Sequence, residues 1–184
     1  MKVKQLKINI VQSSGSAQAF REVRQVDSLA LRHAFGSFGT GVTVVTTLAA
    51  NKQLVGLTAN SFSSVSLDPP ILLWSLNANS PSLKAFDECG RFVVNVLAHD
   101  QVALSKRFAS KHANKFEGIS YRFNGYGLAV LNGCAAAFDC KTEQRLIVGD
   151  HVVFLGRVES FERQDNDGLL FCQGRYARGA LLED

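Results

Sequence analysis

Four short stretches of this 184-residue sequence carry side chains that could bind a polar ligand. The longest runs from Gly56 to Ser66 and is rich in hydroxyl and amide side chains that follow a strand-like segment. Such a loop, with backbone N–H groups left free, can hydrogen-bond the edge of a heteroaromatic ring or a phosphate. The same composition is also typical of a turn that satisfies only its own backbone. Composition alone leaves both interpretations open.

The second stretch covers residues 75–82 and could hold an anion. Ser75, Asn77 and Ser82 surround a predicted helix start at Ser80-Pro81. The free N–H groups and the positive end of the dipole of such a helix would face a nearby phosphate. Ordinary helix capping is the alternative interpretation.

The third and fourth stretches each centre on one residue that can carry a positive charge. Arg107 can bind a phosphate through two parallel hydrogen bonds, while the neighbouring Phe108 could cover an apolar ring. His151 follows a Gly-Asp turn, and because an imidazole can carry a positive charge it could contact an anionic or hydride-donating ligand. A solvated helix end for Arg107 and a merely exposed His151 are the alternatives.

Several common kinds of active site find no support in the sequence. It contains no GxSxG, HExxH or GxxxxGK[ST] motif, and no GxGxxG between a strand and a helix. The four cysteines form no CxxC pair and have no histidine at metal-ligand spacing, which predicts reduced, packed thiols and no metal site. Hydrolase, P-loop and Rossmann assignments therefore lose support.

Charge and hydropathy narrow the range of partners. The net charge of +4 and the pI of about 9.0 favour anionic ligands but are spread too thinly to imply nucleic acid. No stretch approaches the roughly 20 apolar residues that cross a bilayer, and the first residues have no apolar core of a signal peptide. We therefore expect a cytoplasmic protein that binds phosphorylated small molecules, with neither nucleic acid nor membrane as partner.

The elements that must position these stretches are mostly strands. We expect residues 1–25 to form a loosely held arm and residues 26–184 to form one domain. Apolar spacing and caps predict a helix that Asp27 or Ser28 caps and that Gly39 and Gly41 end. They also predict helices from Ser80 to Gly90 and from Asp100 to Phe108. The β-branched runs predict the strands 42–48, 54–58, 71–76, 91–97, 135–147 and 151–161, with a short strand after Gly168 and an excursion loop over 110–127. Consecutive strands with few helices favour a barrel.

Taken in order, these motifs resemble the short-chain flavin reductases, the reductase partners of two-component flavin-dependent monooxygenases. The resemblance extends over roughly residues 28–178. It is carried by FGTGVTVVTT at 38–47, GLTANSF at 56–62, SVSLDPP at 64–70, NSPS at 79–82, FVVNVL at 92–97 and GDH at 149–151. It implies a mostly β fold with short helices, a Greek-key split β-barrel of the FMN-binding type.

The resemblance also implies a set of site residues. Flavin would contact Thr58, Ala59, Asn60 and Ser61, with Ser75, Leu76 and Asn77 at the ring edge and Ser82, Arg107 and Phe108 on the phosphate side. His151 would be the catalytic residue that orients the nicotinamide. No general acid is needed, because hydride passes directly from nicotinamide to flavin while the protein supplies geometry.

The implied activity is NAD(P)H-dependent reduction of FMN or FAD, with NADH or NADPH as co-substrate and reduced flavin passed to a separate monooxygenase. A homodimer is implied as well. A non-catalytic flavin-binding electron carrier on the same barrel is the alternative, and His151 favours the enzyme over it. A split-barrel oxidase of a small substrate such as pyridoxamine phosphate would need a more basic pocket than the sequence offers.

Overall fold

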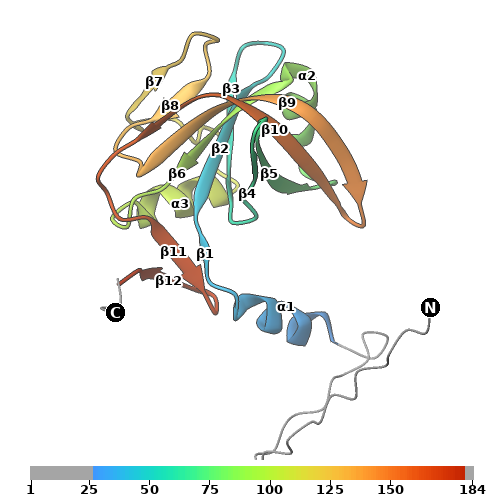
Figure 1. Ribbon diagram of the computed structural model, residues 1–184, viewed down its shortest axis with the longest axis vertical. Coiled ribbons are helices and arrows are strands. Elements are labelled where there is room, and N and C mark those ends of the chain that lie inside the picture. Colours follow the sequence, from blue (N-terminus) through green and yellow to red (C-terminus); the bar gives the residue numbers. More distant parts are fainter. Residues whose placement is uncertain (1–26, 181–184) are drawn as a thin grey trace, which may run out of the picture.

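The computed structural model describes residues 27–180, which form a curved antiparallel sheet with three short helices (Figure 1). The predicted arm, residues 1–25, lies outside the described residues. The helices are α1 (Ser28–Gly36), α2 (Leu83–Cys89) and α3 (Val102–Ala109). The strands are β1 (Thr40–Gly41), β2 (Thr43–Leu48), β3 (Leu54–Ala59), β4 (Ser63–Leu67), β5 (Pro70–Asn77), β6 (Arg91–Val96), β7 (Tyr121–Phe123), β8 (Ala129–Leu131), β9 (Ala136–Val148), β10 (His151–Arg163), β11 (Leu169–Cys172) and β12 (Arg175–Arg178).

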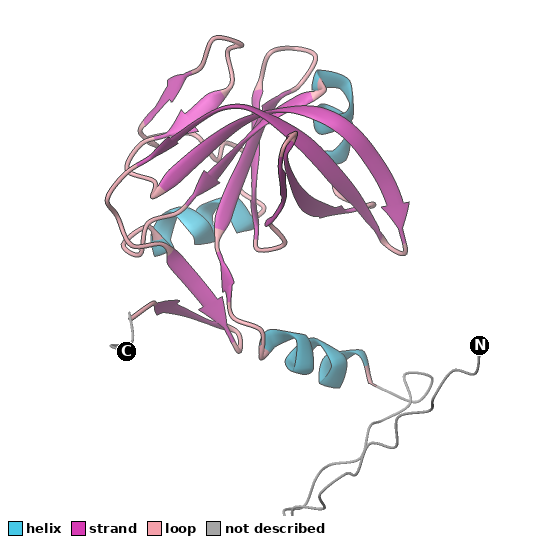
Figure 2. Cartoon of the chain, viewed as in Figure 1, coloured by secondary structure: helices cyan, strands magenta, loops and turns pink. Residues whose placement is uncertain are grey.

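The principal sheet has seven strands in the order β3-β2-β6-β9-β10-β5-β4. Hairpins join neighbours such as β9 and β10, whereas β2 pairs with β6 and β10 with β5 across long connections. Register shifts within the β9–β10 ladder bend these two 13-residue strands so that the sheet curls (Figure 2). This confirms the predicted mostly β split barrel.

The strands curl around an aromatic core. Trp74 stacks on Phe154 with ring centroids 4.9 Å apart, and Phe86 and Phe92 meet the same indole edge-on. All four rings are fully buried. A second cluster lies between the sheet and α3, where Phe108 meets Phe116 edge-on at 4.9 Å. The two clusters fix the positions of β3 and β5, which carry five of the eleven predicted site residues.

Several local predictions are confirmed and others are wrong. Asp27 caps α1 through its side chain, and Gly90 ends α2 in the left-handed conformation with φ 63°. Asp100 does not cap α3, because Gln101 occupies that position, without a side-chain capping bond. The helix expected at Ser80 begins at Leu83, after a turn in which the hydroxyl of Ser80 accepts from the N–H of Ser82.

The polar stretch after Gly56 is not the open loop that its composition suggests. Thr58 and Ala59 belong to β3, and Ser63–Leu67 forms β4, which pairs with β5. A serine-rich segment can form this strand because β4 lies at the edge of the sheet, where most of its side chains face solvent. Only residues 60–62 remain as a tight corner between the two strands.

Candidate functional site

Strand β3 presents unpaired backbone groups because it is an edge of the sheet, with β2 on one side only. The carbonyl of Gly56 points away from β2 and accepts a hydrogen bond from Lys115 Nζ at 3.3 Å. Because backbone groups alternate along a strand, the N–H and C=O of Thr58 point the same way. A flat ligand with donors and acceptors on its edge could pair with this row.

The hydroxyls at the β3–β4 corner are already engaged within the protein. Thr58 donates to the carbonyl of Ser105 at 2.7 Å, which ties β3 to α3. Ser61 Oγ accepts from the N–H of Ser75 at 2.8 Å, and donates to the carbonyl of Ser75 at 3.1 Å. The exposed Asn60 side chain donates to Thr40 Oγ1 at 3.3 Å. The corner is therefore rigid, and its hydroxyls could offer a ligand their remaining lone pairs.

The predicted ring-edge residues lie on β5 and next to His151. Asn77 is the partner of His151 in the β5–β10 ladder, so the two predicted groups are brought together. His151 Nδ1 lies 2.8 Å from Asp150 Oδ1, and this contact holds the pKa of Asp150 below its usual range. Leu76 departs from the prediction, because its side chain is buried in the core. The backbone groups of Ser75 face Ser61, so those of Leu76 face the opposite way, toward its partner Val152 on β10.

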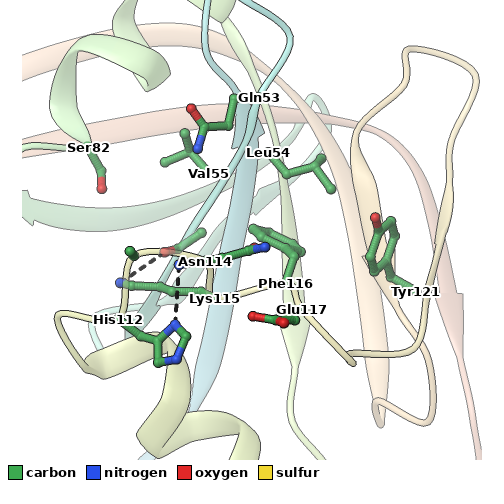
Figure 3. A pocket seen from close by; sticks show the side chains of 12 residues that line it. Gln53, Leu54, Val55, Ser82, His112, Asn114, Lys115, Phe116, Glu117 and Tyr121 are labelled. Carbon is green, nitrogen blue, oxygen red and sulfur yellow. Dashed lines mark hydrogen bonds between the residues drawn. The ribbon is translucent and has the colours of Figure 1, made fainter.

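A cavity of about 620 Å³ lies at the other end of β3 (Figure 3). Ser82 lies on one side of it, and Lys115 and His112 lie across from Ser82. Its complete lining is Gln53, Leu54, Val55, Gly56, Ser82, His112, Ala113, Asn114, Lys115, Phe116, Glu117 and Tyr121. A hydroxyl facing an ammonium and an imidazole is a suitable donor set for a phosphate.

Lys115 is the strongest donor in this cavity. Its ammonium donates to the carbonyl of Phe108 at 2.8 Å and to the carbonyl of Gly56. An ammonium carries three donors, so one remains for a ligand. Partial burial lowers the pKa of Lys115, since the charged form loses solvation. A bound phosphate would restore some of that lost stabilisation.

Arg107 does not line this cavity, contrary to the predicted phosphate contact. Its guanidinium donates to three backbone carbonyls, those of Lys115 at 2.8 Å, Glu117 at 2.7 Å and Asn114 at 3.2 Å. These bonds fasten residues 112–117, which we call the 112–117 wall. Arg107 thus positions Lys115 by binding its backbone on the side away from the cavity.

Phe108 also differs from its predicted role. Its side chain is fully buried and packs against Gly56, where an added Cβ would lie 2.6 Å from the phenyl ring. A ring with no exposed surface cannot cover a ligand, so Phe108 supports β3 from beneath.

Sequence reasoning missed the residues of the 112–117 wall. Lys115, His112 and Asn114 fall in the segment predicted as an excursion loop, which is rich in Lys and His. Its basic residues were a usable signal for a phosphate site. Sequence spacing could not show which of these residues faces β3. That depends on how the bonds from Arg107 to the backbone orient residues 112–117.

Comparison with known proteins identifies the family of this chain. The family model described as "Flavin reductase like domain" matches residues 35–180. The chain belongs to the flavin reductase family. It is 41% identical over 146 residues to the reductase component of a flavin-dependent trigonelline monooxygenase from Acinetobacter baylyi, covering 79% of this chain and 47% of that protein. It is 39% identical over 152 residues to an NADH-dependent FMN reductase of Agrobacterium fabrum, covering 83% and 86% of the two chains.

The fold of this flavin reductase homologue is shared with solved structures. An NADH:FAD oxidoreductase of Streptomyces globisporus, solved with NAD and FAD fragments, superposes with a TM-score of 0.81 at 34% identity, covering 86% of this chain and 96% of that one. The flavin reductase of styrene monooxygenase from Pseudomonas putida gives 0.76 at 31% identity, covering 83% and 99%. The chain spans about half the length of the first curated relatives it matches, 48% and 47%.

The residues around β3 fit a flavin. The outward backbone groups of Thr58 can pair with the polar edge of an isoalloxazine, and the cavity with Lys115 and Ser82 can take the phosphate. Within residues 27–180, no cluster of three or more His, Cys, Asp or Glu side chains is arranged to hold a metal ion. None of the helices in the described part of the chain is both long and apolar enough to span a membrane.

Proposed function

We propose that this protein is an NAD(P)H-dependent flavin reductase that supplies reduced FMN, or FAD, to a separate monooxygenase. Membership in the flavin reductase family and the names of relatives support this activity. The observation that carries it in this chain is the arrangement of three groups on β3 and on the β5–β10 pair. These are the corner at residues 58–61, the adjacent Asn77–His151 pair, and the phosphate cavity around Lys115.

The residues of this site have distinct tasks in the proposed mechanism. A bound flavin supplies the chemistry of accepting a hydride. The corner at 58–61 orients the ring through backbone groups, and Lys115 with Ser82 anchors the phosphate. His151, held by Asp150, positions the nicotinamide. No proton transfer by a side chain is required, since the protein contributes by orienting the nicotinamide and the flavin ring and by excluding other reactions of the flavin.

The proposal is tested by anaerobic stopped-flow absorbance of oxidised flavin after mixing with NADH or NADPH. We expect bleaching beyond one flavin per subunit, which identifies a reductase with exchangeable flavin. His151→Ala should slow bleaching or raise the nucleotide KM while leaving flavin affinity unchanged. Bound flavin that is bleached by neither nucleotide would contradict the enzyme and favour the non-catalytic electron carrier. Unchanged kinetics in His151→Ala would remove His151 from the mechanism.

The proposed partners and setting follow from the same assignment. We propose a homodimer, supported by exposed apolar side chains such as Leu67 (93% exposed), Ile147 (74%) and Phe161 (73%). A cytoplasmic location is proposed because all four cysteines lie unpaired within the described residues, as a reducing compartment requires. Sedimentation velocity tests the dimer, and a monomer at micromolar concentration would overturn it.

A further inference from the structure

The largest of the described cavities, about 830 Å³, lies between α1 and the turn that joins β11 to β12. Arg32 and His33 on α1 line it together with the exposed rings of Phe35 and Phe38. Its other walls are Leu29, Gly36, Ser37, Thr40, Asn60, Phe171, Gln173 and Gly174. No residue of α1 is buried, so the helix forms one side of a cavity without packing into the barrel core.

This cavity is a built feature and not a gap beside a loose helix. The N–H of Gln173 donates to the carbonyl of Gly36 at 2.7 Å, which fastens the end of α1 to the β11–β12 turn. Gln173 and Gly174 both have positive φ, 49° and 75°, as a tight two-residue hairpin turn requires. The turn thus holds α1 at a fixed distance from β1.

The cavity borders the proposed flavin site at Asn60. Asn60 belongs both to its lining and to the 58–61 corner, and it donates to Thr40, which also lines the cavity. In Figure 1, α1 lies below the barrel, at the same end as the turn between β9 and β10 that precedes His151. A molecule whose nicotinamide end meets a flavin at this corner would therefore extend toward α1.

We propose that this cavity binds the nucleotide portion of the pyridine dinucleotide, with Arg32 as the residue that binds one of its phosphates. The inference rests on the proposed reductase function. A guanidinium beside exposed aromatic rings suits a ligand that alternates phosphates with flat bases. Leu29, Arg32 and His33 precede residue 35, where the match to the family model begins.

The chemistry leaves two sources for the phosphate, and the test separates them. The pyrophosphate is common to NADH and NADPH, whereas the 2′-phosphate occurs only in NADPH. Isothermal titration of the full chain with NAD⁺ and with NADP⁺ measures binding without any turnover. Arg32→Ala should weaken at least one of them by about 10-fold or more, as expected for loss of a charged hydrogen bond. Equal weakening assigns the pyrophosphate, and weakening of NADP⁺ alone assigns the 2′-phosphate.

The matched control is Arg163→Ala, at the end of β10 and outside the residues that line the cavity, which should bind both dinucleotides as the unaltered protein does. If Arg32→Ala also binds both normally while the unaltered protein reduces flavin, the inference is wrong and the reductase stands. If the unaltered protein binds dinucleotide through Arg32 but reduces no flavin, the proposed function fails instead. Sedimentation velocity of Arg32→Ala supplies the last outcome, because a loss of dimer with unchanged dinucleotide binding would show that a second copy covers the cavity.

Discussion

The 112–117 wall and α1 border cavities at opposite ends of β3, yet the barrel holds them in very different ways. Arg107 fastens the wall through three carbonyls, and Phe116 packs into the second aromatic cluster. Helix α1 has no buried residue, and its link to the barrel includes the carbonyl of Gly36, which accepts from the N–H of Gln173 and from the thiol of Cys172. The phosphate end of the proposed flavin site is therefore preorganised, while the proposed nucleotide end rests on an exposed element.

The largest expected contrast comes from removing one phenyl ring on each side. Phe108→Ala should lower the free energy of unfolding by about 3–5 kcal/mol, because it opens a cavity in a fully buried cluster. Phe35→Ala should change it by less than about 0.5 kcal/mol, since that ring is 71% exposed. Urea denaturation measures both. Similar losses of unfolding free energy in the two variants would show that α1 is packed as firmly as α3, which would contradict the proposed difference between the two regions.

A smaller effect is expected from two glycine substitutions. Gly56→Ala places a Cβ 2.6 Å from Phe108, and overpacking of this kind costs about 1–3 kcal/mol. The control is Gly41→Ala on β1, where nothing lies within 4 Å of the added Cβ. Thermal unfolding should show a lower midpoint for Gly56→Ala only. A midpoint of Gly56→Ala equal to that of the unaltered protein would mean that the wall and β3 separate easily.

The function of the wall is tested through Arg107. Arg107→Ala should weaken flavin binding by about 10-fold, because the three carbonyls lose their shared donor and Lys115 loses its support. Arg107→Lys should not restore binding, since one ammonium cannot reproduce the fork of the guanidinium. Fluorescence titration with FMN measures the dissociation constants. Full recovery in Arg107→Lys would indicate that charge alone matters and that the wall needs no fastening.

The smallest effect near neutral pH concerns Lys115. Burial lowers its pKa below the ordinary 10.5, and only the protonated ammonium attracts a phosphate. Flavin affinity should therefore stay constant while the pH is well below the lowered pKa of Lys115, and it should fall as the pH rises through that pKa. In Lys115→Arg the fall should disappear, because a guanidinium stays charged. A dissociation constant that varies identically with pH in both proteins would exclude Lys115 as the anchor.

The sequence was sufficient to predict the six longer strands β2, β3, β5, β6, β9 and β10, the start of α1 after Asp27 and the end of α2 at Gly90, because these depend on local periodicity and turn residues. It could not show that the hydroxyl of Ser61 accepts a hydrogen bond from the N–H of Ser75, since that bond joins two segments that only the tertiary fold brings together. Apolar spacing likewise revealed the apolar face of α1 but not that Phe35 and Phe38 remain exposed. Whether Arg107 binds ligand or backbone depended on where residues 112–117 fold, which spacing does not encode.

The position of Trp74 gives the protein a built-in optical reporter. It is the sole tryptophan of the sequence, and it lies fully buried between Phe86, Phe92 and Phe154. Within the described residues its indole N–H has no hydrogen-bond acceptor, and the three phenyl rings make its surroundings apolar. Its emission should lie at short wavelength in the native protein and move to long wavelength only when the barrel opens. The same signal will not respond to movements of α1, so the two regions can be followed separately in one sample.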